Sequence, residues 1–439
     1  MADTKEILQQ LRDFESRNIL FIEEDGSWPI VWERAKGVNV WDAEGKKYLD
    51  MTAAFGVATA GHANPNVLKA GQKQMAQLLH AMGDVHPHAL KAQLAQKLSQ
   101  ITFEHWANPQ ELKTKNSKFK TGKVIFCNSG FEAVEAALKT AILATKKNGV
   151  IAFTGGYHGL GYGALNVTHR DFFRNPFQSQ LREFGNFVSF PKTISDLPTV
   201  EFQIRNFFRR GRIGAILAEP VQTRGGINVP PPGFLPLLRK LCDEFGVLLI
   251  LDEIYTGFGR TGKWFACEHS GVVPDLICLG KALTGGFPLS ACVGRADLMD
   301  AAWPPSRGEA IHTSTFLGHP VGCAMALAQI SEIEKLKLCE CSAGLGKFLL
   351  NELASIKNSK SKIKHSARGL GLMAGLELTL PDGKPATAAA LAAIKTLLQR
   401  GYIFLPEGEH GNVISFTPPL TITKSQLAKA VGALVEVLR

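Results

Sequence analysis

The sequence predicts an α/β protein in which helices cover a mostly parallel sheet. Short apolar runs that are typical of buried strands alternate along the chain with amphipathic helical patterns, which is how a parallel sheet with crossover helices is encoded. Several of these runs end in polar residues, and the carboxyl ends of parallel strands meet at one edge of a sheet. The 439 residues, 45% of them hydrophobic, suffice for one large core and a smaller second domain.

The clearest strand–helix unit begins at residues 123–127. This apolar strand is followed by a turn and then by apolar residues at helical spacing, namely Val134, Ala137, Leu138, Ala141 and Ile142. In the turn, Ser129 and Glu132 have the spacing of a capping box, which predicts that the helix begins there. The free N–H groups at the start of such a helix form an anion site.

Further elements follow in the same alternation. Strands are expected at 150–154, 213–221, 247–253 and 275–280, an amphipathic helix at 234–245, a long helix from Pro320, and a last helix capped by Thr423 and Gln426. The run 247–253 is apolar until it ends in Asp252 and Glu253, and the run 275–280 leads directly to Lys281. We therefore expect an acid and a lysine at the same edge of the sheet.

Composition excludes several classes of protein. No apolar run reaches the length of a membrane span and the first thirty residues lack the apolar centre of a signal peptide, so we expect a soluble, cytoplasmic protein with no membrane partner. The eight cysteines are expected to be reduced core residues, with no metal site. The net charge of +10 is spread along the chain, and its one cluster, Lys113 to Lys123, is expected to be a surface loop, so no nucleic-acid partner is expected.

The stretch 257–263, GFGRTGK, matches two phosphate-loop patterns. The P-loop pattern requires Ser or Thr after the lysine to hold magnesium, but Trp264 stands there. The dinucleotide pattern requires a helix directly after the strand, but three residues intervene and no helical pattern follows. A nucleotide site at this stretch is therefore only a remote alternative.

The residues at the sheet edge describe a different pocket. A lysine, an acid and a helix-terminus anion site together suit pyridoxal phosphate, which needs an amine for a Schiff base, a carboxylate beside its ring nitrogen and a site for its phosphate. Lys281, Asp252 and the turn at Ser129 supply these groups. Tyr157, which follows the strand 150–154, adds an aromatic face for the ring.

These residues lie in motifs through which the chain resembles the class III pyridoxal-phosphate aminotransferases of fold type I. That group includes ornithine, acetylornithine, 4-aminobutyrate and amine:pyruvate transaminases. The motifs run in order over nearly the whole chain: residues 40–50, 128–130, 157–159, 219–222, 251–262, 280–283, 313–316 and 416–419. The resemblance implies that GFGRTG is a loop after the acid that pairs with the cofactor.

The resemblance also implies roles for single residues. Lys281 would hold the cofactor as a Schiff base and move the proton between the substrate carbon and the cofactor. Asp252 would pair with the pyridinium nitrogen. Ser129 and Gly130, with the N–H of Phe131, would bind the phosphate.

Other implied roles concern the cofactor's ring and a second subunit. Tyr157 would stack on one face of the ring and Ile254 would press on the other, while His158 is read as structural. Thr315 would reach the phosphate of the neighbouring subunit's cofactor, so a homodimer with shared active sites is implied.

Three positions depart from the family pattern. Ser415 stands where members that grip an α-carboxylate commonly have arginine, and Leu160 stands where many continue His-Gly with arginine. Tyr255 replaces a glutamine near the cofactor's phenolic oxygen, to which it can still donate a hydrogen bond. The loss of the two arginines argues against an ornithine or acetylornithine substrate.

Arg224 occupies a position that is glutamate in several relatives. Its guanidinium either binds the carboxylate of a keto-acid acceptor or forms a structural ion pair with Glu219 or another acid. Phe55, Gly56 and Val57 would give an apolar wall at the pocket mouth. The expected reaction is amino transfer from an ω-amine, or an amine without a required α-carboxylate, to pyruvate or 2-oxoglutarate.

The same resemblance implies the domain organisation. Residues 61–324 would form the large cofactor-binding domain, while residues 1–60 and 325–439 would form a smaller α+β domain from both termini. An aminomutase or decarboxylase on the same cofactor is the nearest alternative function, followed by a binding protein that has kept the fold but lost turnover.

Overall fold

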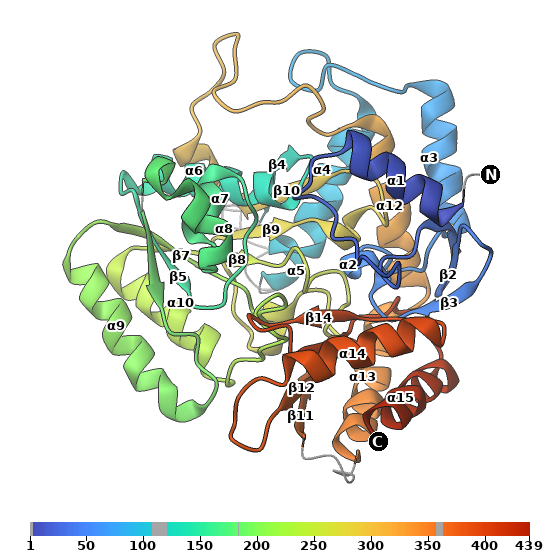
Figure 1. Ribbon diagram of the computed structural model, residues 1–439. Coiled ribbons are helices and arrows are strands. Elements are labelled where there is room, and N and C mark those ends of the chain that lie inside the picture. Colours follow the sequence, from blue (N-terminus) through green and yellow to red (C-terminus); the bar gives the residue numbers. More distant parts are fainter. Residues whose placement is uncertain (1–2, 108–120, 183, 357–362) are drawn as a thin grey trace.

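The computed structural model describes residues 3–107, 121–182, 184–356 and 363–439 (Figure 1). Most of the basic cluster at 113–123 lies outside these described residues. Within them, no helix combines the length and the apolar character that crossing a membrane requires.

A seven-stranded sheet forms the centre of the molecule (Figure 1). Its strands are β4 (Gly122–Cys127), β5 (Gly149–Phe153), β6 (Gly185–Val188), β7 (Ile213–Ala218), β8 (Leu248–Asp252), β9 (Leu276–Leu279) and β10 (Ser290–Arg295). Their order is β4-β10-β9-β8-β7-β5-β6, and every pairing is parallel except the two that β10 makes. The predicted mostly parallel sheet is confirmed.

Helices cover both faces of this sheet. They include α4 (Ala89–Ile101), α5 (Phe103–Trp106), α6 (Gly130–Thr145), α7 (Tyr162–Val167), α8 (Asp171–Arg174), α9 (Leu197–Arg209), α10 (Phe234–Phe245) and α11 (Ala296–Ala302). Successive residues of β8 enter two different cores: Leu249 and Leu251 pack in the cluster that contains Leu238 of α10, while Ile250 packs with Val134 of α6. The strand is apolar at every position before Asp252 because both of its faces are covered.

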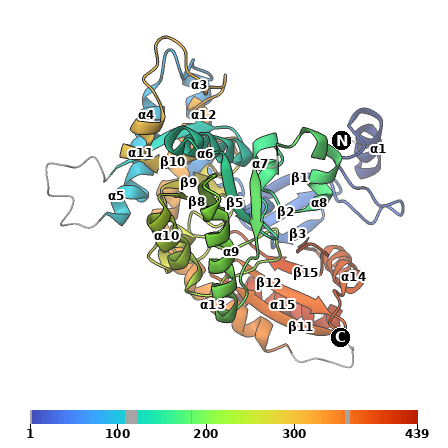
Figure 2. The same ribbon diagram turned by 90° about the vertical axis from the view of Figure 1, so that its left-hand side faces the viewer.

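Two smaller sheets bring the two ends of the chain together. One contains β1 (Trp32–Lys36), β2 (Asn39–Asp42), β3 (Lys47–Asp50) and β13 (Tyr402–Ile403), and the other contains β11 (Lys364–Gly369), β12 (Ala374–Thr379), β15 (Val413–Phe416) and β14 (Leu405–Glu407). Strand β13 pairs in parallel with β3, so the N-terminal and C-terminal segments share one sheet. Figure 2 shows the red C-terminal elements below the helices and strands of the large sheet.

The remaining helices include some that pack on the smaller sheets and others that pack on neighbouring helices. They are α1 (Thr4–Phe14), α2 (Ala53–Gly56), α3 (Pro65–Gln77), α12 (Pro320–Lys335), α13 (Leu338–Ala354), α14 (Thr387–Gln399) and α15 (Lys424–Leu438), with short 3₁₀ turns η2 (Asn175–Gln180), η3 (Ile194–Asp196), η4 (Ala266–His269) and η5 (Lys281–Leu283). The domain division at residues 60 and 324 stays a proposal, and its second boundary falls inside α12.

One predicted feature of the helices is confirmed and two are corrected. The final helix begins with the predicted capping box of Thr423 and Gln426. The predicted capping box of Ser129 and Glu132 is wrong: the Ser129 side chain makes no capping hydrogen bond, and Glu132 Oε2 accepts from the N–H of Asn128 at 2.8 Å. Ile142, placed in the buried stripe of α6, is instead 43% exposed, whereas its neighbour Ala141 is buried.

The GFGRTGK stretch forms a loop that packs into the interior. Arg260 is only 1% exposed, and its Nη1 donates to the carbonyl oxygens of Leu372 at 3.1 Å and Pro418 at 2.5 Å. Gly262 has a φ of +94° and lies so close to Ala343 that a side chain there would collide with it. The 3₁₀ turn η4 follows the loop, so these glycines join the large sheet to the C-terminal elements and do not open a phosphate-binding helix.

Candidate active site

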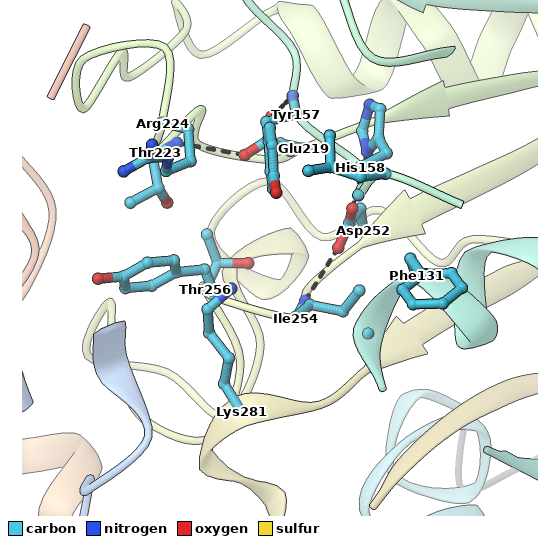
Figure 3. A pocket seen from close by; sticks show the side chains of 14 residues that line it. Phe131, Tyr157, His158, Glu219, Thr223, Arg224, Asp252, Ile254, Thr256 and Lys281 are labelled. Atoms are coloured by element: carbon cyan, nitrogen blue, oxygen red, sulfur yellow. Dashed lines mark hydrogen bonds and ion pairs between the residues drawn. The ribbon is translucent and has the colours of Figure 1, made fainter. Parts of the chain in front are cut away.

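A cavity of about 420 Å³ lies at the carboxyl ends of the central parallel strands (Figure 3). Its lining is Gly130, Phe131, Tyr157, His158, Gly159, Leu160, Glu219, Thr223, Arg224, Asp252, Ile254, Tyr255, Thr256 and Lys281. The cavity thus brings together Lys281, Asp252 and the start of α6, as the strand ends predicted. Ser129 precedes Gly130 at the same helix start.

Lys281 begins the turn η5 directly after β9 and Gly280. Its backbone has a φ of +36°, a region that residues other than glycine seldom adopt. Burial lowers the pKa of its amine, although the nearby carboxylates of Asp252 and Glu219 act in the opposite direction. A lysine with a lowered pKa is more often neutral at physiological pH, and the neutral amine is the nucleophile.

Asp252 is the last residue of β8 and is held on both carboxylate oxygens. Oδ1 accepts from the N–H of Ile254 at 3.1 Å, and Oδ2 lies 2.7 Å from His158 Nδ1. Both side chains are buried. Burial alone lowers the pKa of His158, but the hydrogen bond and the charge of Asp252 outweigh it, so the pKa is raised. Sequence reasoning treated His158 as structural, although it follows Tyr157 at the same sheet edge.

The start of α6 offers an unsatisfied anion site. Ser129 Oγ is buried and has no hydrogen-bond partner among the described residues, while the Ser129 carbonyl accepts from Ser290 Oγ at 2.6 Å. A Cβ on Gly130 would lie 3.1 Å from Ile254, so a larger residue would crowd the cavity wall. A buried hydroxyl without a partner, beside the free N–H groups of a long helix, fits a phosphate.

Glu219 is a second buried acid of the cavity, which sequence analysis saw only as part of a motif. Its Oε1 accepts from the N–H of Tyr157 at 3.0 Å and its Oε2 from the N–H of Thr223 at 3.2 Å. Burial raises the pKa of Glu219 to about 7. The carboxylate therefore ties together two backbone segments that line the cavity.

Arg224 faces an acid, but not Glu219. Its Nη1 lies 3.3 Å from Oε2 of Glu407 in β14, and its guanidinium carbon lies 5.8 Å from the centroid of the Tyr157 ring. Arg170 Nη2 donates to the Arg224 carbonyl at 2.6 Å. The predicted alternative of an ion pair with Glu219 or another acid is present with Glu407, and Arg224 also lines the cavity, where a substrate carboxylate can reach it.

Tyr255 closes the side of the cavity next to Lys281. The amine Nζ lies 4.6 Å from the centroid of the Tyr255 ring. The phenol oxygen lies 3.2 Å from Thr417 Oγ1, and a Cβ on Gly56 would lie 2.7 Å from the ring. The predicted hydrogen bond from this phenol to the cofactor stays a prediction, because in the single chain the hydroxyl contacts Thr417.

Three predicted residues lie outside the lining of this cavity in the single chain. Phe55 and Thr315 are exposed and Val57 is half-buried. Ala53, Ala54 and Phe55 have φ values of +47°, +49° and +61°, so this segment is strained beside the cavity. Their roles at a shared site stay predictions.

Comparison with known proteins identifies the family. A family model described as "Aminotransferase class-III" matches residues 21–438. The chain belongs to the class III aminotransferases. It therefore uses pyridoxal phosphate to transfer an amino group between an amine and a keto acid, and its fold is that of the fold type I transaminases.

Similar proteins differ in their named substrates. The chain is 37% identical over 409 residues to an acetylornithine aminotransferase of Methanosarcina mazei, covering 93% of this chain and 92% of that protein. It is 36% identical over 449 residues to a putrescine aminotransferase of Pectobacterium atrosepticum, covering 100% and 89%. An amine transaminase structure from an uncultivated Pseudomonas species, in its pyridoxal-phosphate-bound form, has a TM-score of 0.85 at 28% identity and covers 97% and 98%. Because the identities to the first two proteins are nearly equal, overall similarity does not distinguish between their substrates. The substrate of this class III aminotransferase must be inferred from its own residues.

The geometry of this class III enzyme suits the cofactor. Lys281 supplies an amine of lowered pKa, Asp252 a buried carboxylate held by His158, and Ser129 an unpaired buried hydroxyl at a helix start. An amine, a carboxylate and an anion site are the groups that pyridoxal phosphate needs for its aldehyde, its ring nitrogen and its phosphate, so these residues fit the cofactor.

Proposed function

We propose that this enzyme is an ω-type transaminase, which takes the amino group from an amine without a required α-carboxylate and passes it to pyruvate or 2-oxoglutarate. The observation that carries the proposal is the identity of Ser415 together with its burial and its hydrogen bond. This residue stands where members that grip an α-carboxylate commonly carry arginine. Its side chain is buried, and its Oγ donates to the carbonyl of Leu405 at 3.0 Å. Ser415 therefore offers a donor substrate neither a cation nor a free hydroxyl.

The proposed cofactor site uses residues that line the cavity or adjoin it. Lys281 holds the cofactor covalently, and Asp252 pairs with its ring nitrogen. Ser129, Gly130 and the N–H of Phe131 bind the phosphate. When bound, pyridoxal phosphate supplies an electron sink for the substrate carbon.

Tyr157 and Ile254 are proposed to hold the cofactor ring between them and to exclude water from its two faces. Lys281, once the substrate amine has displaced it, removes the proton from the amine-bearing carbon and returns it to the cofactor's C4′. A neutral amine is required for the first of these steps, and burial of Lys281 favours it because it lowers the pKa.

Arg224 is proposed to bind the carboxylate of the keto-acid acceptor. It is 30% exposed on the side chain and reaches the cavity, so an incoming carboxylate has access to it. A second subunit would complete the site, with Thr315 at the phosphate and Phe55 and Val57 at the mouth. We also propose a cytoplasmic location, which suits the eight free cysteines.

The test begins with the absorbance spectrum of the purified protein before and after borohydride, with Lys281→Ala alongside. The native protein should show a visible band that disappears on reduction as the cofactor becomes permanently attached to the chain. If the variant lacks this band, the result supports the cofactor and its lysine. A panel of amines and α-amino acids, each with pyruvate or 2-oxoglutarate, then identifies the donor class.

Stoichiometric amino transfer separates a transaminase from an aminomutase or decarboxylase. The proposal requires that amines lacking an α-carboxylate give one amino acid product for each amine consumed. Turnover of α-amino acids alone, or carbon dioxide release without amino transfer, would contradict it.

A further inference from the structure

The acid opposite Arg224 is an unusually poorly satisfied carboxylate. Glu407 lies in β14, is 2% exposed, and its Oε2 has no hydrogen bond among the described residues. The nearest cation, Arg224 Nη1, lies 3.3 Å from that oxygen. A buried carboxylate normally has aligned donors on its oxygens, because an unmade hydrogen bond to a charge is costly.

Other arginine–carboxylate pairs in the same chain are closer and better aligned. Arg205 donates from Nη1 and Nη2 to the two carboxylate oxygens of Glu244 at 2.6 and 2.8 Å, although that pair lies at the surface. Arg239 donates to Asp275 at 2.8 Å. The Arg224–Glu407 contact is longer although Glu407 is buried, and it leaves an acceptor site on Glu407 that a better-placed cation can take.

Glu407 is linked to the cavity through Arg224, which lines it together with Lys281. The N–H of Gly408 donates to the Arg224 carbonyl at 3.2 Å, so β14 is tied to the wall of the cavity. Glu407 and Lys281 also act on each other electrostatically, since each changes the pKa of the other. Arg170 also acts electrostatically on Glu407, but its guanidinium already donates to the Arg224 carbonyl.

We propose that Glu407 binds the distal ammonium group of an α,ω-diamine whose other amino group is transferred at Lys281. This inference rests on the proposed function and names the donor class for the same site. The ammonium takes the acceptor site on Glu407 and frees Arg224, which then receives the carboxylate of the keto acid in the second half of the reaction. Each substrate thus binds one member of the ion pair.

The arrangement predicts an order of donors. A monoamine leaves the ion pair intact and gains nothing from Glu407. An ω-amino acid brings its carboxylate toward a buried acid, which is unfavourable unless Arg224 moves to meet it. A diamine of matching length is therefore the best donor.

The test compares diamines and unbranched monoamines of four and five carbons on the holoenzyme. Glu407→Gln keeps the size of the side chain and removes its charge. It should lower kcat/KM for the diamines by about tenfold or more, the scale of one charge-assisted hydrogen bond, with most of the change in KM. The monoamines should change by no more than about twofold.

Glu409→Gln is the matched control. Glu409 is an exposed acid close to Glu407 in the same segment, and its replacement should leave both classes of donor unchanged. Calorimetric titration of the Lys281→Ala protein with a diamine adds a readout without turnover: heat of binding should be present, and it should be lost when Glu407→Gln is added. Thermal unfolding checks that each variant is folded.

The possible failures are distinguishable. If no amine without an α-carboxylate is a donor, the proposed function is wrong. Suppose that monoamines are donors for the native enzyme. If Glu407→Gln then lowers kcat/KM equally for monoamines and diamines, or if the native enzyme shows no preference for diamines, this inference is wrong and the proposed function stands.

Discussion

His158 Nδ1 and Asp252 Oδ2 lie 2.7 Å apart in the interior behind the candidate active site. The second oxygen of Asp252 accepts from the N–H of Ile254, so the histidine is the side-chain partner that fixes the carboxylate. Since the imidazole holds one oxygen of Asp252 and a backbone N–H holds the other, we expect His158 to act as a positioning residue for the acid that is proposed to pair with the cofactor.

We therefore expect His158→Ala to lower kcat/KM by about tenfold or more, since a buried carboxylate oxygen left without its donor costs on the order of 1–3 kcal/mol. The variant should still form the covalent lysine linkage, because Lys281 is untouched. Steady-state kinetics and the absorbance spectrum after borohydride measure the two effects separately. Full activity in the variant would show that Asp252 is positioned without the histidine.

Ser129→Ala should affect the empty protein and the cofactor complex in opposite directions. The Ser129 hydroxyl is buried without a partner, so its removal should leave the stability of the cofactor-free protein unchanged or slightly higher. The same change removes a donor to the phosphate and should weaken cofactor binding by about tenfold. Thermal unfolding of the stripped protein and cofactor titration test both parts.

Ser290→Ala is the control for this experiment. Ser290 Oγ donates to the Ser129 carbonyl at 2.6 Å, so its removal should destabilise the stripped protein by about 1 kcal/mol. If Ser129→Ala destabilises the stripped protein as much, its hydroxyl has a structural role that the unpaired geometry does not show.

Arg224→Ala should raise the KM of the keto-acid acceptor by about tenfold or more, because one charge-assisted contact to the carboxylate is lost. Arg224→Lys should give an intermediate value, since the ammonium keeps the charge but not the planar fork. The KM of a monoamine donor, measured in the first half-reaction, should not change. An unchanged acceptor KM in Arg224→Ala would assign the residue to a structural ion pair with Glu407.

We expect the stability of the cofactor-free protein to depend on pH because Glu219 is buried. Burial raises its pKa from 4.5 to about 7, so between these values the folded chain keeps a proton that the unfolded chain has released. Stability therefore falls as the pH rises through this window, by roughly 3 kcal/mol in total from this residue. Glu219→Gln should remove that contribution.

Urea unfolding at several pH values between 4.5 and 7.5 measures the effect. The slope of stability against pH should be less negative in Glu219→Gln than in the native chain. Glu253, whose pKa burial also raises to about 7, contributes equally to both proteins and cancels in the difference. Identical slopes would mean that the unfolded and folded chains bind the same number of protons at Glu219.

Much of the candidate site could be predicted from the sequence because its residues lie at strand ends. The run before Asp252 and the run before Lys281 are apolar at every position, so the two strands are buried and their ends must meet at one edge. Periodicity and motif order likewise determined the helix at 234–245, the final capping box and the family. These are local signals, read within about a dozen residues.

The tertiary structure decided what depends on distant contacts. His158 and Asp252 are 94 residues apart in the chain, and no local pattern pairs them. The partner of Arg224 comes from β14, beyond the whole large sheet, so the sequence could name Glu219 but left the alternative acid unspecified. Ser129 matched a capping box, yet the N–H of Glu132 donates to the Ser129 carbonyl and not to its hydroxyl, and the Glu132 carboxylate accepts from Asn128. Spacing defines which groups can meet, but packing determines which of several reachable partners a side chain takes.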